Sequence, residues 1–129
     1  MELDDRARRA LAGANFAAIA TSMPDGAPHV STVWIDADGD DVLVNTAEGR
    51  VKTENVRRDP RVSISLIDRE DPYEQVVIHG TVVDVSTDGA DGHIDRLAKK
   101  YLGVDAYPWR DAQEQRVILR IRPDRVSSG

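Results

Sequence analysis

The sequence has no cysteine, few aromatic residues and only three lysines. The absence of cysteine excludes disulfides, thiolate metal sites and a cysteine nucleophile, and it is compatible with a reducing cytoplasm. The net charge is -6, and no basic stretch is interleaved with aromatic side chains. Because phosphate contacts need clustered cations, we expect no nucleic-acid partner. Any anion must therefore be bound by a local group of cations.

The chain also lacks any apolar run approaching the ~18 residues of a membrane-spanning helix. Its first stretch, "MELDDRARRALAGA", is charged from Glu2 onward and has no apolar core of the kind found in signal peptides. We therefore expect a cytoplasmic protein with no membrane partner. A length of 129 residues suits one core, so residues 1–129 are predicted to form a single domain.

Apolar alternation predicts a mainly β protein with small helices. The expected strands cover residues 16–22, 28–36, 41–46, 61–68, 75–85 and 115–126, and the expected helices 4–13, 47–58 and 89–102. The clearest strand is "RVSISLID", in which Val62, Ile64 and Leu66 should point inward. Gly80, inside a long β-branched stretch, predicts a bend or a close backbone approach. Six strands without regular βα alternation favour an antiparallel barrel.

The stretch "NTAEGRVKTENVRRDP" (45–60) places Arg50 and Lys52 at the beginning of an expected helix. The helix dipole disfavours cations there by about 0.3–1 kcal/mol each. An anion would change the balance, because free backbone N–H groups, the dipole and two cations would converge on one phosphate. The alternative is ion pairing at helical spacing, Glu48 with Lys52 and Glu54 with Arg50 or Arg58. The spacing permits both interpretations.

The three histidines, His29, His79 and His93, lie on different expected elements and lack the paired spacing of metal ligands. The chain also shows no nucleophile with an adjacent base. We therefore predict no metal site and no catalytic side chain of the usual kinds.

Three segments in order, "WIDADGDDVLVNTAEGRVKTENVRRDPRVSISLID", "EQVVIHGTVVDV" and "RVILRIRPDRV", resemble the split β-barrel flavin-binding superfamily of pyridoxamine 5'-phosphate oxidase. The form "GRVKTENVRRDPRVSI" is similar to the actinobacterial branch of that superfamily, which uses the deazaflavin coenzyme F420. The likeness extends over residues 14–126. It implies a six-stranded antiparallel split β-barrel.

The resemblance also implies a cofactor site. Arg50 and Lys52 would bind the cofactor phosphate, and the end of the preceding strand would run beside the ring. Residues 31–34 would line the other side of the ring, and the beginning of the strand at Gln75 would contribute contacts across a dimer interface. The implied cofactor-binding residues are Ser31, Val33, Trp34, Asn45, Thr46, Arg50, Lys52, Asn55, Gln75, Ile78 and His79.

The function implied by the resemblance is an F420-dependent oxidoreductase that transfers a hydride between the deazaflavin and a small conjugated organic substrate. Two alternatives remain: an FMN-binding oxidoreductase with the same groove, and a non-catalytic carrier of a flavin or tetrapyrrole. The interior of a small barrel is filled by side chains, so a planar cofactor must lie in an external groove. Two-fold pairing is the simplest way to deepen it, and we expect a homodimer with the groove at its interface.

Overall fold

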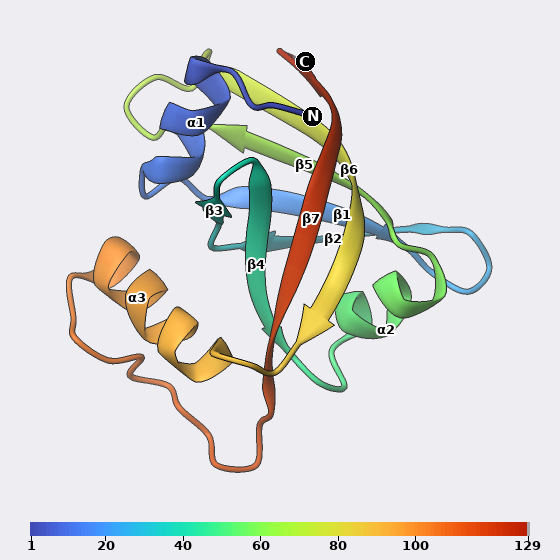
Figure 1. Ribbon diagram of the computed structural model, residues 1–129, viewed down its shortest axis with the longest axis vertical. Helices are drawn as coiled ribbons and strands as arrows, with labels where there is room; N and C mark the ends of the chain where they lie inside the picture. Colours follow the sequence, from blue (N-terminus) through green and yellow to red (C-terminus); the bar gives the residue numbers. More distant parts are fainter. Residues whose placement is uncertain (129) are drawn as a thin grey trace.

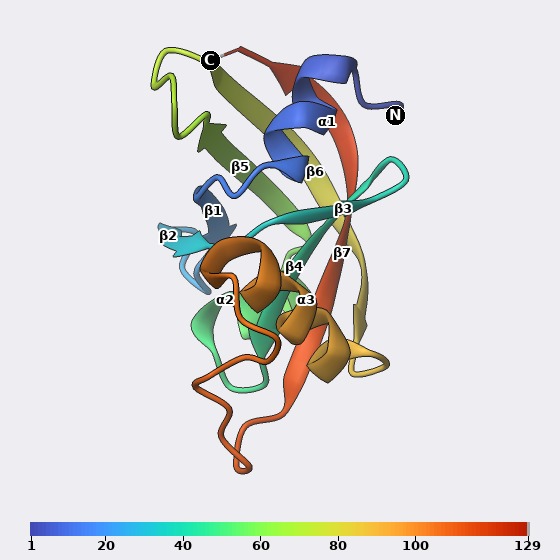
Figure 2. The same ribbon diagram turned by 90° about the vertical axis from the view of Figure 1, so that its left-hand side faces the viewer.

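The computed structural model describes residues 1–128 and contains three helices and seven strands. Figures 1 and 2 show the strands curling into one sheet, with the helices around its margins. The elements in chain order are α1 (Asp5–Ala12), β1 (Ala17–Ser22), β2 (Pro28–Val33), β3 (Asp36–Asp38), β4 (Asp41–Ala47), α2 (Val51–Arg58), β5 (Arg61–Ile67), β6 (Gln75–Ser86), α3 (Ala90–Leu102) and β7 (Arg116–Ser127).

The seven strands form one antiparallel sheet in the order β2-β1-β5-β6-β7-β4-β3. This confirms the mainly β class, but the sheet is not closed and the expected count of six strands is wrong. The strand expected over 28–36 is divided at Trp34 and Ile35. There the backbone N–H of Ile35 donates to the Tyr101 hydroxyl, and its carbonyl accepts from Lys100 Nζ. Because α3 satisfies these groups, β2 pairs with β1 alone while β3 turns back onto β4.

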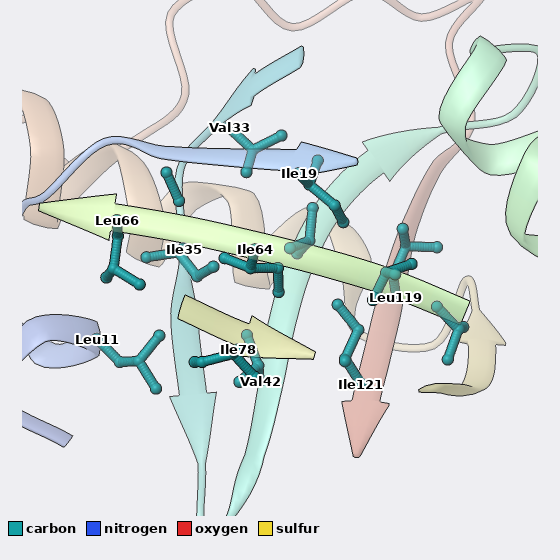
Figure 3. Packing of buried hydrophobic residues seen from close by; sticks show 14 of the residues in the cluster. Leu11, Ile19, Val33, Ile35, Val42, Ile64, Leu66, Ile78, Leu119 and Ile121 are labelled. Carbon is teal, nitrogen blue, oxygen red and sulfur yellow. The ribbon is translucent and has the colours of Figure 1, made fainter. Parts of the chain in front are cut away.

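The core fills the inside of the curled sheet. Val62, Ile64 and Leu66 are all buried, as their alternation predicts. Figure 3 shows side chains from several strands, together with Leu11 of α1, gathered in one cluster. The interior is therefore occupied by aliphatic side chains, and a ligand must bind outside it.

The helices differ from expectation mainly at one end of α2. Ala47, expected as the first helical residue, still pairs with Arg116 in the sheet, and the chain then turns through Gly49 with φ +84°. The helix begins only at Val51, with Arg50 as its N-cap residue. Across residues 1–128, none of the helices combines the length and apolar character that crossing a bilayer requires.

Gly80 tests the packing of β6 on β7. A Cβ atom there would lie 2.7 Å from Ile121 Cγ2 and 2.8 Å from the carbonyl oxygen of Arg122, at a point where the register shifts. We expect Gly80→Ala to lower the free energy of unfolding by about 1–3 kcal/mol in urea titration. Gly92→Ala is the control. Gly92 is inside α3, and a Cβ atom there would lie no closer than 3.7 Å to another group, so this substitution should raise the free energy of unfolding by about 0.5–1 kcal/mol. Equal stability of the two variants would contradict the close approach.

Candidate functional site

A groove of about 240 Å³ lies where β4 leads into α2 and where the α3–β7 loop passes. Its walls come from distant parts of the chain, including the end of β2, α3 and the beginning of β7. The lining residues are Phe16, Thr32, Val33, Trp34, Asn45, Thr46, Arg50, Lys52, Ile94, Tyr107, Trp109 and Arg116.

Three cations gather at one end of the groove. Arg50 precedes α2, Lys52 is in its first turn, and Arg116 is brought opposite Ala47 by the pairing of β4 with β7. Burial, and then repulsion by Arg50 and Arg116, hold the pKa of Lys52 below its ordinary value. Over residues 1–128 Lys52 makes no salt bridge, and no side chain caps the beginning of α2. This end of the groove thus carries uncompensated positive charge beside free helical N–H groups.

One carboxylate lies among these cations. Glu114 Oε2 accepts from Arg50 Nη2 at 2.9 Å, and Glu114 Oε1 accepts from Arg116 Nη1 at 2.6 Å. The hydrogen bond from Arg50, and then that from Arg116, holds the pKa of Glu114 below its ordinary value. Glu114 joins the two arginines, and Lys52 has no carboxylate partner in the part of the chain that the structure describes.

The helical ion pairs considered from the sequence do not form among the described residues. Glu48 instead binds Arg57 through both carboxylate oxygens, at 2.5 and 2.6 Å. Glu54 also lies by Arg57, 3.4 Å away. The alternative that Glu48 neutralises Lys52 was therefore wrong, because Arg57 one turn further along the chain takes that carboxylate.

Asn45 forms the buried floor beside the cations. Its Oδ1 accepts from Arg116 Nε at 2.8 Å, and its Nδ2 lies 2.9 Å from the Ala90 carbonyl oxygen and 3.1 Å from His93 Nδ1. His93 Nε2 in turn lies 3.1 Å from Asp36 Oδ2. Burial alone would raise the pKa of Asp36, but the hydrogen bonds from His93 and the Ala37 N–H hold it below its ordinary value.

Aromatic rings form the other end of the groove. Trp34 stacks on Tyr101 with ring centroids 5.1 Å apart. Tyr107 is edge-on to Trp34 and Trp109 is tilted against it, with centroid distances of 6.1 and 6.5 Å. Asp95 anchors the loop carrying these two residues, since its carboxylate accepts from the Tyr107 backbone N–H at 2.9 Å. A fixed indole and an exposed Trp109 thus offer flat apolar surface to a planar ligand.

The structure brings six of the predicted site residues into this groove: Val33, Trp34, Asn45, Thr46, Arg50 and Lys52. The other five lie elsewhere in the subunit. Ser31 faces inward from β2, and its hydroxyl finds no partner among residues 1–128. Asn55 is buried against Thr21. Ile78 is a core residue, so its side chain does not reach the groove.

Gln75 and His79 lie on the outer face of β6. Gln75 donates to Ser65 Oγ at 3.1 Å, and His79 Nδ1 lies 3.0 Å from Ser63 Oγ. Neither contacts the groove of its own subunit, so the cofactor contacts expected of them remain predictions that require a second chain.

Thr32 also lines the groove, within the range 31–34 expected beside the ring. Five lining residues were not predicted from the sequence: Phe16, Ile94, Tyr107, Trp109 and Arg116. Arg116 matters most, because it adds a third cation to Arg50 and Lys52. The signal that assigns Arg116 to the groove is its register against Ala47, which the sequence alone does not contain.

The partly buried charge of Lys52 allows a prediction about stability. We expect Lys52→Met to raise the free energy of unfolding at pH 7 by about 0.3–1 kcal/mol in a buffer free of phosphate, since it removes a cation from the first turn of α2. The charged Lys52 destabilises the folded state fully at pH values below its lowered pKa, and this destabilisation disappears as pH rises from there toward 10.5. The difference in unfolding free energy between wild type and Lys52→Met should therefore narrow at alkaline pH. Lys99→Met is the control, because Lys99 is exposed and paired with Asp105. Destabilisation by Lys52→Met at pH 7 would contradict the charge imbalance.

Comparison with known proteins gives a family from the sequence and a shared fold from the structure. A family model described as pyridoxamine 5'-phosphate oxidase matches residues 3–128. A solved F420 reductase is 29% identical, with a TM-score of 0.85 and coverage of 95% of this chain and 96% of that one.

Two further structures share the fold. A conserved hypothetical protein from Mycobacterium tuberculosis is 24% identical at a TM-score of 0.76, covering 98% of this chain and 83% of that one. A putative pyridoxamine 5'-phosphate oxidase from Listeria innocua is 21% identical at a TM-score of 0.62, covering 87% and 86%. A match that spans nearly every residue, on a fold shared with these proteins, shows that the chain belongs to the pyridoxamine 5'-phosphate oxidase family of oxidoreductases.

Proposed function

We propose that the protein is an F420-dependent reductase that binds the deazaflavin in this groove and reduces a small conjugated organic substrate. The observation that carries the proposal is the cation cluster of Arg50, Lys52 and Arg116, in which Lys52 lacks a carboxylate partner among residues 1–128. The likeness to a solved F420 reductase over nearly the full length of both chains supports the choice of coenzyme.

The donor set fits a phosphorylated ring compound. Cations and uncapped N–H groups at the beginning of α2 suit a phosphate, and the flat surfaces of Trp34 and Trp109 suit a ring. Asn45 and Thr46, near the end of β4, come between Trp34 and Arg50 in the sequence and line the same groove. Arg50, Lys52 and Arg116 would hold the phosphate, and Trp34 would lie against the ring.

The groove offers placement and a dry surface rather than a reactive side chain. A bound deazaflavin supplies the hydride for reduction. Among the described residues no carboxylate, histidine or cysteine lines the groove, so the residues present would orient the reactants and exclude water. The aromatic wall favours a planar, conjugated acceptor over a compact polar one.

The same groove supports a homodimer. At about 240 Å³ it is smaller than the roughly 300–1,000 Å³ of most ligand pockets, so a single subunit supplies only part of a site. The adjoining outer face of β2, β1, β5 and the first half of β6 bears no charged side chain at its central described positions. These positions are Pro28, Val30, Thr32, Ala18, Ala20, Ser22, Ser63, Ser65, Ile67, Gln75, Val77 and His79.

Such a face is unusual in a chain with 31% charged residues, and depletion of charge is characteristic of interface cores. Thr32 belongs both to this face and to the groove. A second copy packed on the face would therefore adjoin the groove and could add Gln75 and His79 to it. This arrangement gives the two residues the role that the family resemblance implies.

FMN is the alternative cofactor, because its phosphate suits the same cations and the family is named for a flavin-using oxidase. Fluorescence titration with F420 and FMN distinguishes the two. We expect F420 to bind, and Lys52→Ala to weaken it about 10- to 100-fold through the loss of a charge-assisted hydrogen bond. Lys99→Ala should bind as the wild type does. Tighter binding of FMN would transfer the assignment to an FMN enzyme, and F420 binding without reduction of any conjugated acceptor would leave a carrier.

The dimer prediction is tested by a charge placed on the uncharged face. Ala20→Glu should produce monomers at micromolar concentration in sedimentation velocity, because it buries an unpaired carboxylate between subunits. It should also weaken F420 binding at least tenfold if the partner completes the groove. Ala12→Glu, at an exposed position of α1, is the matched control. A dimeric Ala20→Glu protein would refute this interface.

A further inference from the structure

His93 is a buried titratable residue that the proposed function does not use. It lies in α3 with no exposed surface, outside the groove lining. Its two ring nitrogens face different partners, Nδ1 toward Asn45 Nδ2 and Nε2 toward Asp36 Oδ2, both at 3.1 Å. The ring thus connects a carboxylate outside the groove to an amide on the groove floor.

The chemistry of the neighbours fixes the direction of each hydrogen bond. A guanidinium can only donate, so Asn45 must present its Oδ1 to Arg116 Nε. A carbonyl oxygen can only accept, so the amide NH₂ of Asn45 must face Ala90. The same NH₂ then donates to His93 Nδ1, which must be unprotonated. The proton of the neutral ring is therefore on Nε2, where it is donated to Asp36.

We infer that His93 is a positioning residue for the phosphate end of the groove: together with the Ala90 carbonyl, its Nδ1 holds Asn45 in the orientation that receives Arg116 Nε. With Nε bound to Asn45 and Nη1 to Glu114, the Arg116 guanidinium is held at two points beside Lys52. Loss of the Nδ1 acceptor leaves the Ala90 carbonyl as the only described acceptor for the Asn45 NH₂, so Asn45 holds Arg116 less firmly. Which ligand binds at this end depends on the proposed function. The hydrogen bonds that connect Asp36 to Arg116 do not depend on it.

If His93 served only to fill space between α3 and the sheet, the orientation of Asn45 would not depend on its Nδ1. Two substitutions distinguish this packing role from the positioning role. His93→Asn places a carbonyl oxygen near the position of Nδ1 and keeps an acceptor for Asn45. His93→Gln places an amide nitrogen near the position of Nε2 and keeps a donor for Asp36. Each variant retains one of the two hydrogen bonds. Their melting temperatures, measured by thermal unfolding, should therefore be similar.

The first test uses the protein without cofactor. In ¹⁵N-histidine NMR spectra we expect His93 to be protonated on Nε2 alone. The Arg116 Nε–H signal, assigned with Arg116→Lys, should be protected from solvent exchange in the wild type and in His93→Asn. It should exchange at least about tenfold faster in His93→Gln. A proton on Nδ1, or equal protection of Arg116 in both variants, would overturn the inference.

The second test measures F420 and FMN affinity of the same variants. We expect His93→Asn to bind within about threefold of the wild type and His93→Gln to bind at least about tenfold more weakly, at similar melting temperatures. Wild-type affinity in both variants, or equal losses that follow their melting temperatures, would overturn the inference. If the wild type binds neither cofactor, the proposed function fails, and the exchange of Arg116 Nε–H still decides whether His93 positions it.

Discussion

The groove depends on the antiparallel pairing of β4 with β7. This ladder sets Ala47 opposite Arg116, and the hydrogen bond from the Glu48 N–H to the Gln115 carbonyl extends it by one residue at 2.9 Å. The chain can then turn sharply at Gly49, so the beginning of α2 and the beginning of β7 lie side by side. Cations separated by more than sixty positions in the sequence are thereby forced together.

That convergence is unfavourable in the free protein. Glu114 accepts hydrogen bonds from two of the cations but compensates only one positive charge. Lys52 is partly buried with a lowered pKa, and the first turn of α2 lacks a side-chain cap over the described chain. Conflicts between local preference and global fold are expected at functional sites, where a ligand resolves them. A phosphate would satisfy the N–H groups and the ammonium together. A carboxylate in place of Lys52 or Arg50 would favour the helix and remove the site.

Patterns within a strand predicted the fold well, because alternation depends only on which face is buried. Val62, Ile64, Leu66 and the close approach at Gly80 followed from it. The interruption after Val33 did not, since the partners of Ile35 are on α3, more than sixty residues away. Arg116 entered the site through strand register, which depends on all neighbouring strands together. The sequence therefore predicts well the features set by neighbours along the chain and poorly those set by partners across space.

If the proposed function holds, cations that bind a phosphate cannot by themselves select a cofactor, because F420 and FMN would both present a phosphate to Arg50, Lys52 and Arg116. The opposite end of the groove, where the two ring systems differ, would offer a basis for selection. There Trp34 is fixed by stacking on Tyr101, whereas Trp109 is exposed on a loop anchored by Asp95. Trp34 would set the plane in which a ring can lie. The loop that carries Trp109 would set the width of the groove next to that ring. In a cofactor-bound protein the cation cluster would therefore contribute affinity, and the aromatic end together with a partner subunit would contribute specificity.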